Sequence, residues 1–432
     1  MKLKKYKLGD LMEVTRGASL SGDYFATQGN FIRLTCGNFD YRNNCFKANK
    51  SKENIYYTGN FKQEFLLEKG DIITPLTEQA IGLLGSTARI PESGKYIQSQ
   101  DVAKVSCNKD LLDENFAFYL ISSACVKQQL SAAAQQTKIR HTSPDKIKGC
   151  IVWIPSLDEQ KRIGRILADI DTKIAINRQI NDNLEAMAKQ LYDYWFVQFD
   201  FPNEEGKPYK SSGGEMVYNE RLKRDIPKNW NDCLLGDYIG RITNGLNPRK
   251  NFVLGSGKNY YVTIRSLVGT TIDWNNCDRC DDDALKKINS RSQLQIGDVI
   301  FSAIGTIGRT YYILEEPNNW NISETSFTLR PKEDVPNDFF YGMLRSDEIQ
   351  IKADKAAMGS TLRCLVMDSL CSILYVKIPK TLVQNFSCKV SAIYRQIHRN
   401  NQEIAELTKQ RDELLPLLMN GQATVNYHLS DD

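Results

Sequence analysis

The stretch Lys69-Gly70-Asp71-Ile72-Ile73 is the most informative in the chain, because a close copy of it occurs later. The copy is Ile296-Gly297-Asp298-Val299-Ile300, and the two glycines lie 227 positions apart. In both places a glycine and an aspartate precede a short apolar run, which is typical of a turn that leads into a β-strand. A repeat over this distance predicts two similar lobes related by pseudo-symmetry.

Further matches lie on either side of this motif. Lys7-Leu8-Gly9-Asp10 returns as Leu234-Leu235-Gly236-Asp237, and Ala80-Ile81-Gly82-Leu83-Leu84-Gly85 returns as Ala303-Ile304-Gly305-Thr306-Ile307-Gly308. Around them, both halves consist of short apolar runs broken by Gly, Asn and Pro, which predict strands and turns. Two similar lobes with different surfaces suit a bipartite target better than one small-molecule pocket.

A long helix is expected at the end of each half. Ser156 with Glu159, and Thr381 with Gln384, each fit a capping box, in which side chains satisfy the free amides of the first helical turn. Beyond these starts, apolar residues recur at alternating spacings of four and three, which predicts a coiled coil. A helix of ~40 residues is ~60 Å long, too long to be buried inside one lobe. We expect the two helices to pair in antiparallel order; the alternative is that each packs along its own lobe.

The helix pair is expected to bury one seam of each helix. Asn177 and Asn400 hold equivalent seam positions near the middle of the helices, where a polar residue fixes register. We expect these two side chains to hydrogen-bond to each other across a pseudo-twofold axis; the alternative is that they face solvent. The residues predicted to pair the helices are Ile163, Leu167, Ile170, Ile174, Asn177, Leu184, Leu191, Val390, Ile393, Ile397, Asn400, Ile404, Leu407 and Leu414.

The predicted fold class is α+β, with two pseudo-symmetric lobes of mixed, β-rich structure separated by two long antiparallel coiled-coil helices. The segment between the halves is polar and rich in turns, which indicates an exposed linker. The predicted boundaries are 1–155 for the first lobe, 156–200 for the first long helix, 201–232 for the linker, 233–379 for the second lobe, 380–421 for the second long helix and 422–432 for a C-terminal tail.

Composition places the chain among ordinary globular proteins. The 432 residues are 41% hydrophobic and 25% charged, and the net charge is only +4, which permits nucleic-acid binding on a local basic face without requiring it. Eleven cysteines without regular spacing indicate reduced thiols. No stretch approaches the ~20 apolar residues of a membrane span, so we expect a cytoplasmic protein without a membrane partner.

Familiar catalytic and metal-binding motifs are missing. Gly255-Ser256-Gly257-Lys258-Asn259 resembles a phosphate loop only briefly, because Phe252 stands where its first glycine is needed. Cys277-Asp278-Arg279-Cys280 is one C-x-x-C without a second pair at zinc spacing, so we interpret it as a turn with incidental thiols. We therefore predict no catalytic residue and no metal site.

Several of these segments together resemble one family. Ile154-Pro155-Ser156-Leu157-Asp158-Glu159-Gln160-Lys161-Arg162-Ile163 is similar to the P-x-x-E-Q-x-x-I helix start of type I restriction-modification specificity subunits. Ile378-Pro379-Lys380-Thr381-Leu382-Val383-Gln384 resembles a degenerate second copy, and 414–421 resembles the end of the second helix. The Gly-Asp strands also resemble those of the family's target-recognition domains. The similarity covers nearly the whole chain.

The resemblance implies a DNA-recognition subunit that is not an enzyme by itself. Each lobe would be a target-recognition domain that reads one half of a bipartite site in double-stranded DNA, and the target would be asymmetric because the lobes differ in sequence. The two long helices would set the spacer and dock two methyltransferase subunits, with restriction/translocase subunits completing the complex. The chain would have no cofactor of its own, since S-adenosylmethionine, ATP and Mg belong to those partners.

Candidate DNA contacts are polar residues on loops that occur in both lobes. We match Ile32-Arg33-Leu34 with Ile264-Arg265-Ser266, Lys138-Ile139-Arg140 with Thr361-Leu362-Arg363, and Thr15-Arg16-Gly17 with Thr243-Asn244-Gly245. Glu78 precedes one candidate and is itself expected to face a groove. The alternative for any one arginine is a solvated or salt-bridged surface group. The predicted DNA-binding residues are Arg16, Arg33, Gln79, Lys138, Arg140, Asn244, Arg265, Thr361 and Arg363.

Two other functions are compatible with parts of the sequence. One is a self-sufficient DNA-modifying enzyme, against which the missing cofactor motifs weigh. The other is a coiled-coil scaffold without sequence specificity, which leaves the duplicated strand-rich lobes unexplained.

Overall fold

The computed structural model describes residues 2–50, 53–78, 82–133 and 140–424. The chain forms two compact units, Met1–Ala175 with Ala405–Asp432, and Ile176–Ile404. Both long helices contribute to both units, so the division falls within the helices rather than at the predicted lobe boundaries. Within the described residues, no helix combines the length and the apolar character needed to cross a membrane.

The first unit is built on a four-stranded antiparallel sheet of order β10-β8-β12-β2. In a second sheet, β11-β4-β7-β3, strands β4 and β11 run parallel. Its strands are β1 (Lys4–Lys7), β2 (Met12–Arg16), β3 (Phe25–Ala26), β4 (Phe31–Arg33), β5 (Phe39–Asp40), β6 (Cys45–Phe46), β7 (Tyr56–Tyr57), β8 (Ile72–Pro75), β9 (Thr77–Glu78), β10 (Ala88–Arg89), β11 (Tyr96–Ile97), β12 (Val102–Cys107), β13 (Arg140–His141) and β14 (Ile151–Ile154). Its short helices are α1 (Leu8–Leu11), α2 (Glu114–Ser122), α3 (Ala124–Ala133) and α4 (Pro144–Lys148).

The second unit repeats this plan. Its four-stranded antiparallel sheet has the order β24-β23-β26-β18, and its other sheet again contains a parallel pair, β19 with β25. The strands are β15 (Met216–Asn219), β16 (Arg224–Pro227), β17 (Asn231–Leu234), β18 (Ile239–Asn244), β19 (Asn259–Val262), β20 (Leu267–Val268), β21 (Thr271–Ile272), β22 (Asp278–Cys280), β23 (Val299–Ser302), β24 (Thr310–Tyr312), β25 (Trp320–Ile322), β26 (Ser326–Pro331) and β27 (Leu374–Lys377). The helices are α6 (Asp282–Ser292), α7 (Asn337–Arg345), α8 (Asp347–Ala356) and α9 (Met367–Cys371). The predicted duplication is therefore confirmed at the level of sheet topology.

The repeated Gly-Asp motif has a structural role in both units. The glycines turn the chain with φ values of +92° and +93°. Asp71 accepts the backbone N–H of the residue three positions earlier at 2.9 Å and binds Lys104 Nζ at 2.7 Å. Asp298 does the same, with Arg330 Nε at 2.7 Å as its cation. The motif recurs because each buried strand end needs a closed turn and a neutralised carboxylate.

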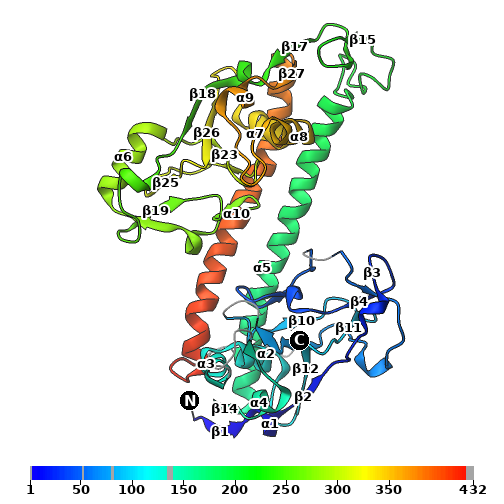
Figure 1. The fold of residues 1–432 in the computed structure, drawn as a ribbon, viewed down its shortest axis with the longest axis vertical. Helices are drawn as coiled ribbons and strands as arrows, with labels where there is room; N and C mark the ends of the chain where they lie inside the picture. The colour runs from blue at the N-terminus through cyan, green and yellow to red at the C-terminus, as the bar shows by residue number, and fades with distance from the viewer. Residues whose placement is uncertain (1, 51–52, 79–81, 134–139, 425–432) are drawn as a thin grey trace. The chain divides into compact units, whose positions relative to one another are not determined.

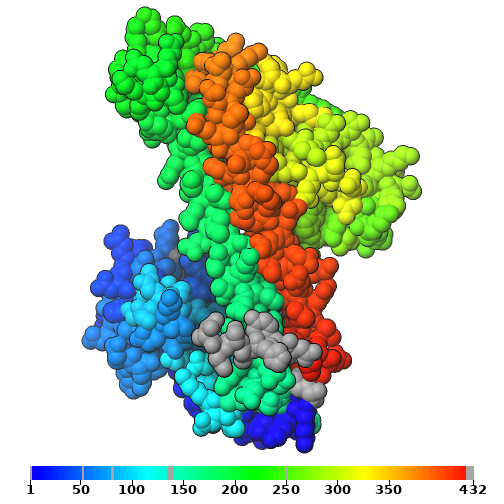
Figure 2. Space-filling model, turned by 180° about the vertical axis from the view of Figure 1, so that it is seen from behind, coloured from blue at the N-terminus to red at the C-terminus, as the bar shows by residue number. Residues whose placement is uncertain are grey.

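The two long helices are α5 (Leu157–Tyr192), which ends in a π-helical turn at Asp193–Val197, and α10 (Lys380–Met419). Within each unit their segments lie side by side, as Figures 1 and 2 show. In the first unit Arg411 binds Asp171 at 2.8 Å, and in the second unit Asn400 binds Asn181 at 2.8 Å. Contact residues with higher numbers on α5 have partners with lower numbers on α10. The predicted antiparallel pairing is therefore confirmed.

The asparagines of the seam pair in a different register from the one expected. Asn177 donates to Glu403 Oε2 at 2.8 Å, whereas Asn400 donates to Asn181 Oδ1 at the same distance. The expected bond between Asn177 and Asn400 is therefore wrong, because the helix register places each asparagine one turn away from the other. Both side chains are still buried, and each donates a hydrogen bond to the other helix.

The predicted seam residues face inward to different degrees. Those that are buried are Ile163, Leu167, Ile174, Asn177, Val390, Ile397 and Asn400. Those that are half-buried are Ile170, Leu184, Leu191, Ile393, Ile404, Leu407 and Leu414. Several of them also pack into the lobes: Ile163 and Leu167 share one apolar cluster with Phe116 of α2 and with Leu418 of α10. The helices thus pair with each other and pack against their lobes at the same time.

The two long helices begin with different contacts to the preceding chain. At α5 the buried Gln160 ties the first turn to the lobe, donating to the carbonyls of Leu111 and Pro155 at 3.1 Å. Helix α10 begins at Lys380, and the N–H groups of its first turn bond to the carbonyl of Pro379.

The segment predicted to be an exposed linker is folded against the second unit. Strands β15 and β16 form an antiparallel hairpin. Before it, Phe201 stacks between Tyr209 at 4.8 Å and Trp230 at 5.1 Å. Phe201 and Trp230 are buried in the core of the unit, together with the end of α5 and with α7. Aromatic residues spaced within a polar stretch gave this segment an apolar face that the composition concealed.

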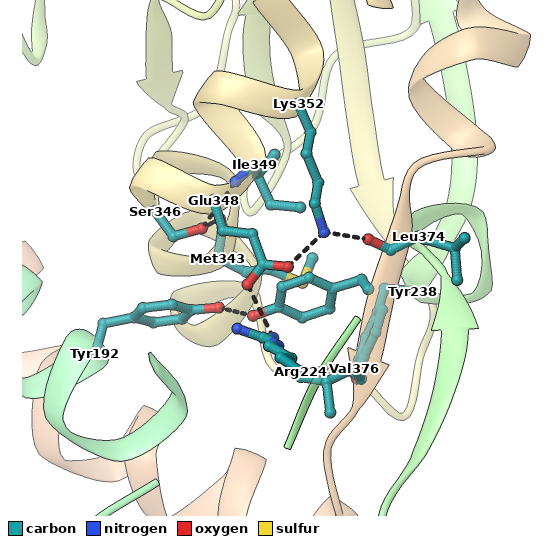
Figure 3. Close-up of polar contacts among 11 residues, drawn as sticks. Tyr192, Arg224, Tyr238, Met343, Ser346, Glu348, Ile349, Lys352, Leu374 and Val376 are labelled. Atoms are coloured by element: carbon teal, nitrogen blue, oxygen red, sulfur yellow. Dashed lines mark hydrogen bonds and ion pairs between the residues drawn. The ribbon is translucent and has the colours of Figure 1, made fainter. Parts of the chain in front are cut away.

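A half-buried polar cluster holds this hairpin to the core, as Figure 3 shows. Glu348 of α8 accepts from Arg224 of β16 at 3.0 Å and from Lys352 at 2.5 Å. Next to it, the hydroxyl groups of Tyr192 of α5 and Tyr375 of β27 form a hydrogen bond inside the core. Helix α5, the hairpin and the lobe are therefore joined at one point.

Candidate nucleic-acid interface

In the first unit, loops that carry predicted contact residues meet at one end of the four-stranded sheet. Arg16 is the last residue of β2 and pairs with Ala103 at the start of β12. Strand β8 ends beside it, and the short strand β9 that follows pairs with β13, which places Arg140 opposite Glu78. The side chain of Arg16 is exposed. One sheet end thus presents residues from loops far apart in the sequence.

The second unit builds the same sheet end. Asn244 is the last residue of β18 and pairs with Phe327 near the start of β26. After β23, the N–H of Gly305 donates to the carbonyl of Arg363 at 2.8 Å, which reproduces the pairing of the β9–β13 segment. Arg16 and Asn244 therefore hold equivalent positions in the two units, and so do Arg140 and Arg363.

A glycine follows Arg16 and Asn244 in both units, and close packing explains it. A Cβ atom at Gly17 would overlap the carbonyl oxygen of Gln98, and one at Gly245 would overlap that of Ile322. The neighbouring connection presses directly on the backbone at this point. The strand end is therefore fixed in the same way in both units.

The predicted match between Arg33 and Arg265 is wrong. Arg33 ends β4 and lies opposite Ile97, and the equivalent position in the second unit is Tyr261 of β19, which lies opposite Asn321. Arg265 lies three residues beyond the end of β19. The sequence match failed because it rested on a stretch of only three residues. The register of the parallel strand pair shows which residues are equivalent, and it does not pair Arg33 with Arg265.

Arg33 is also committed to its own lobe. Its side chain is only 8% exposed, its Nη2 donates to the carbonyl of Asn54 at 3.2 Å, and its guanidinium stacks over the ring of Phe25 at 3.7 Å. Burial lowers the pKa of this guanidinium from its usual value, against the opposing effect of Asp101. Arg265, in contrast, has an exposed side chain.

Other predicted residues are held to different extents. Arg363 donates to Asp354 Oδ1 at 2.7 Å, at the end of α8, and Thr361 beside it is exposed. Glu78 is buried and accepts the N–H of Gly82 at 2.8 Å, so it is bonded within its own lobe. Gln79 and Lys138 lie outside the described residues.

Comparison with known proteins shows what the chain is similar to. Residues 2–186 match the family model for the type I restriction modification DNA specificity domain. This part of the chain is therefore similar to the DNA specificity domain of type I restriction-modification systems.

Curated relatives and solved structures agree with this similarity. The chain is 25% identical over 323 residues to the type I restriction enzyme MjaIX specificity subunit of Methanocaldococcus jannaschii, covering 73% of this chain and 71% of the relative. It is 23% identical to the HindI specificity subunit of Haemophilus influenzae over 97% of this chain and 99% of the relative. The crystal structure of a type I restriction-modification S subunit from M. genitalium has the same fold, with a TM-score of 0.55, 16% identity, and coverage of 97% and 96% of the two chains.

The second sheet end also carries a cation that the sequence did not predict. Arg291, at the end of α6, donates from Nη2 to Asn244 Oδ1 at 2.7 Å. Arg241 of β18 in turn donates to the carbonyl of Arg291 at 3.2 Å. Nothing in the repeat pointed to Arg291, because only a long-range contact brings it to the strand end.

The two cysteines of the C-x-x-C segment pack in different apolar clusters. Cys280 is fully buried at the end of β22, and Cys277 donates to the carbonyl of Asp273 at 3.4 Å. Burial raises the pKa of both thiols. Among the described residues, no group of three or more His, Cys, Asp or Glu side chains could hold a metal ion.

The sheet ends offer hydrogen-bond donors and acceptors of the kind that read nucleic acid.

Proposed function

We propose that this chain is a specificity subunit and recognises double-stranded DNA with its two equivalent sheet ends, each of which reads one half of a bipartite target. The observation that carries the proposal is that the same strand end is built twice but carries different side chains, Arg16 in one unit and Asn244 in the other. Equivalent frames with unlike contacts suit two half-sites of different sequence, so we propose an asymmetric target.

We further propose that α5 and α10 set the distance between the half-sites. Both helices belong to both units and pair through buried side chains, which supports a stiff spacer rather than a flexible tether. Two recognition units on one face of a duplex favour half-site centres about one helical turn apart, ~34 Å.

The remaining activities are proposed to belong to partner subunits. Two methyltransferase subunits would dock on the paired helices, and restriction/translocase subunits would complete the assembly. S-adenosylmethionine, ATP and Mg would be bound by those partners, while this chain would contribute recognition and no catalysis. The names of the relatives, which describe specificity subunits of restriction enzymes, support this division.

The test is a methylome of cells that express this chain with its methyltransferase partner. We expect methylation at one split, non-palindromic sequence. Inserting four residues after Lys173 lengthens α5 by about one turn, ~6 Å, and should lengthen the accepted spacer without changing either half-site. An insertion of equal length in the exposed turn at Gly206 is the control and should leave the spacer unchanged. If the α5 insertion leaves the length of the accepted DNA spacer unchanged, the proposal that the helices set this length is wrong.

The two rival functions make different predictions. A self-sufficient enzyme would methylate DNA when this chain is assayed alone. A scaffold without specificity would bind a scrambled duplex as tightly as the methylated sequence.

A further inference from the structure

We propose that Arg16 and Asn244 determine one base each at equivalent positions of the two half-sites, guanine for Arg16 and adenine for Asn244. The inference rests on the proposed function, because it assigns a base to a residue at each sheet end. It concerns one position in each half-site, at which the two halves of the target should differ.

The backbones place these two side chains in the same way. Each ends the outer strand of its four-stranded sheet, and each pairs with the second residue of the central strand, Ala103 or Phe327. The glycine that follows each is pressed against the neighbouring connection, so neither strand end is free to shift. Equivalent side chains on these frames point to equivalent places on a bound duplex.

The face on which both residues lie continues outward from the core. Side chains two residues apart on a strand share a face. Val14, two residues before Arg16, is buried in the first unit, and Ile242, two residues before Asn244, packs against the core of the second. Arg16 and Asn244 extend these faces past the end of the core, where a ligand can reach them.

Both side chains keep hydrogen-bonding capacity for a ligand. Within the described part of the chain, Arg16 is exposed and its guanidinium has no hydrogen-bond or ion-pair partner. Asn244 accepts from Arg291 at 2.7 Å through Oδ1, while its amide nitrogen donates to no described group. The contact with Arg291 fixes the orientation of the carboxamide and leaves one acceptor site and the donor available. Arg33, in contrast, is buried and already donates to its own lobe.

The chemistry of these groups differs in a way that base pairs can read. A guanidinium donates two parallel hydrogen bonds to O6 and N7 of guanine, and a carboxamide donates to N7 and accepts from N6 of adenine. A good contact of either kind discriminates against the wrong base by about 10- to 100-fold. The pair therefore supplies asymmetry to the target from one position in the repeat.

The experiment selects bound sequences from duplexes in which both half-sites are randomised, using the full chain with its methyltransferase partner. Arg16→Ala should relax one guanine position in one half-site, and Arg16→Asn should shift that position toward adenine by about 10-fold. Asn244→Arg should shift one position of the other half-site toward guanine. The spacer and the remaining positions should not change.

Matched controls separate base reading from charge and from folding. Lys4→Asn removes a charge from exposed β1, and Asn231→Arg adds one on exposed β17; both should leave both half-sites unchanged. Thermal melting of every variant checks that the chain folds.

Variants that lose affinity equally for all sequences would show phosphate contacts and would overturn the inference. If the wild-type chain selects a split target and the variants select the same target, the inference is also overturned. The proposed function would stand in that case. A wild-type chain that selects no sequence would overturn both.

Discussion

At the scale of single residues, Arg411 shows how the first unit holds its two long helices together. Its side chain is 6% exposed, and Nη1 binds Asp171 Oδ1 at 2.8 Å while the hydroxyl of Tyr119 donates to the other carboxylate oxygen at 2.6 Å. Burial acts against the charged guanidinium, yet its pKa is raised because Asp171 and Asp412 bind it. One ion pair thus joins α5, α10 and α2.

Replacing this arginine should destabilise the first unit strongly. Arg411→Ala leaves a partly buried carboxylate without its cation, a loss of about 3 kcal/mol in the free energy of unfolding. Urea denaturation measures this loss, and hydrogen exchange in α2 shows whether it falls on the first unit. The double variant Arg411→Met/Asp171→Leu is the matched control and should recover most of the loss, because it removes both charges. If the single variant is as stable as wild type, the pair does not hold the helices.

The equivalent arginines Arg140 and Arg363 are expected to contact DNA phosphates. Each substitution to alanine should weaken binding to all sequences alike and reduce the slope of log affinity against log salt by about 1. Salt titrations of affinity measure the slope. Lys377→Ala, an exposed lysine of β27, serves as the control with an unchanged slope. An unchanged slope in both arginine variants would remove them from the interface.

At the scale of elements, the sequence was informative wherever a feature was local or repeated. Gly-Asp turns, the strands beside them and the two long helices follow from short-range patterns, and the structure has them all. Failures occurred where tertiary contacts decided. The Asn177–Asn400 bond depended on a helix register that no single pattern fixes, and the match of Arg33 with Arg265 depended on strand pairing.

The candidate site was predictable to a similar extent. Arg16 and Asn244 stand in equivalent places within a repeated Thr-x-Gly motif. Arg140 and Arg363 do so as well, although the arginine alone is shared by these two short segments. Arg291 was missed because α6 approaches the strand end only through the fold. The segment 201–232 was misjudged because its average polarity hides the few aromatic residues that anchor it.

The hairpin β15–β16 provides a test of that anchoring. Glu348→Ala leaves Arg224 and Lys352 without their shared carboxylate and should reduce the stability of the hairpin against local opening by about 2 kcal/mol. Hydrogen exchange in 216–227 measures the change. Glu220→Ala removes an exposed partner of Lys223 and should change the same exchange by less than about 0.5 kcal/mol. Equal effects of the two variants would contradict the role of Glu348.

At the scale of the whole molecule, buried tyrosines should make the protein sensitive to alkali. Burial raises the pKa of Tyr311 to about 12, and desolvation likewise raises the pKa of Tyr119, Tyr238, Tyr312 and Tyr394. In the unfolded chain tyrosines lose their protons near pH ~10. Between that pH and the higher folded pKa values, the unfolded state binds fewer protons than the folded state, so stability falls as pH rises.

Urea midpoints at about pH 8 and about pH 10.5 measure this dependence. We expect a clearly lower midpoint at the higher pH. Tyr311→Phe should reduce the difference between the two midpoints, whereas Tyr24→Phe, at a half-exposed ring, should leave it unchanged. Equal midpoints at both pH values would contradict the burial of the phenol groups.

The passage of α10 into the first unit has a consequence for synthesis on the ribosome. Leu418 and Met419 complete an apolar cluster whose other members lie before residue 168. The amino-terminal unit is therefore translated first but finished last, after every residue of the other unit has emerged. A nascent chain halted near residue 404 would contain all residues of the second unit but would lack the last part of the first unit. Its exposed Ile163 and Leu167 would make it a client for chaperones until the last turns of α10 arrive.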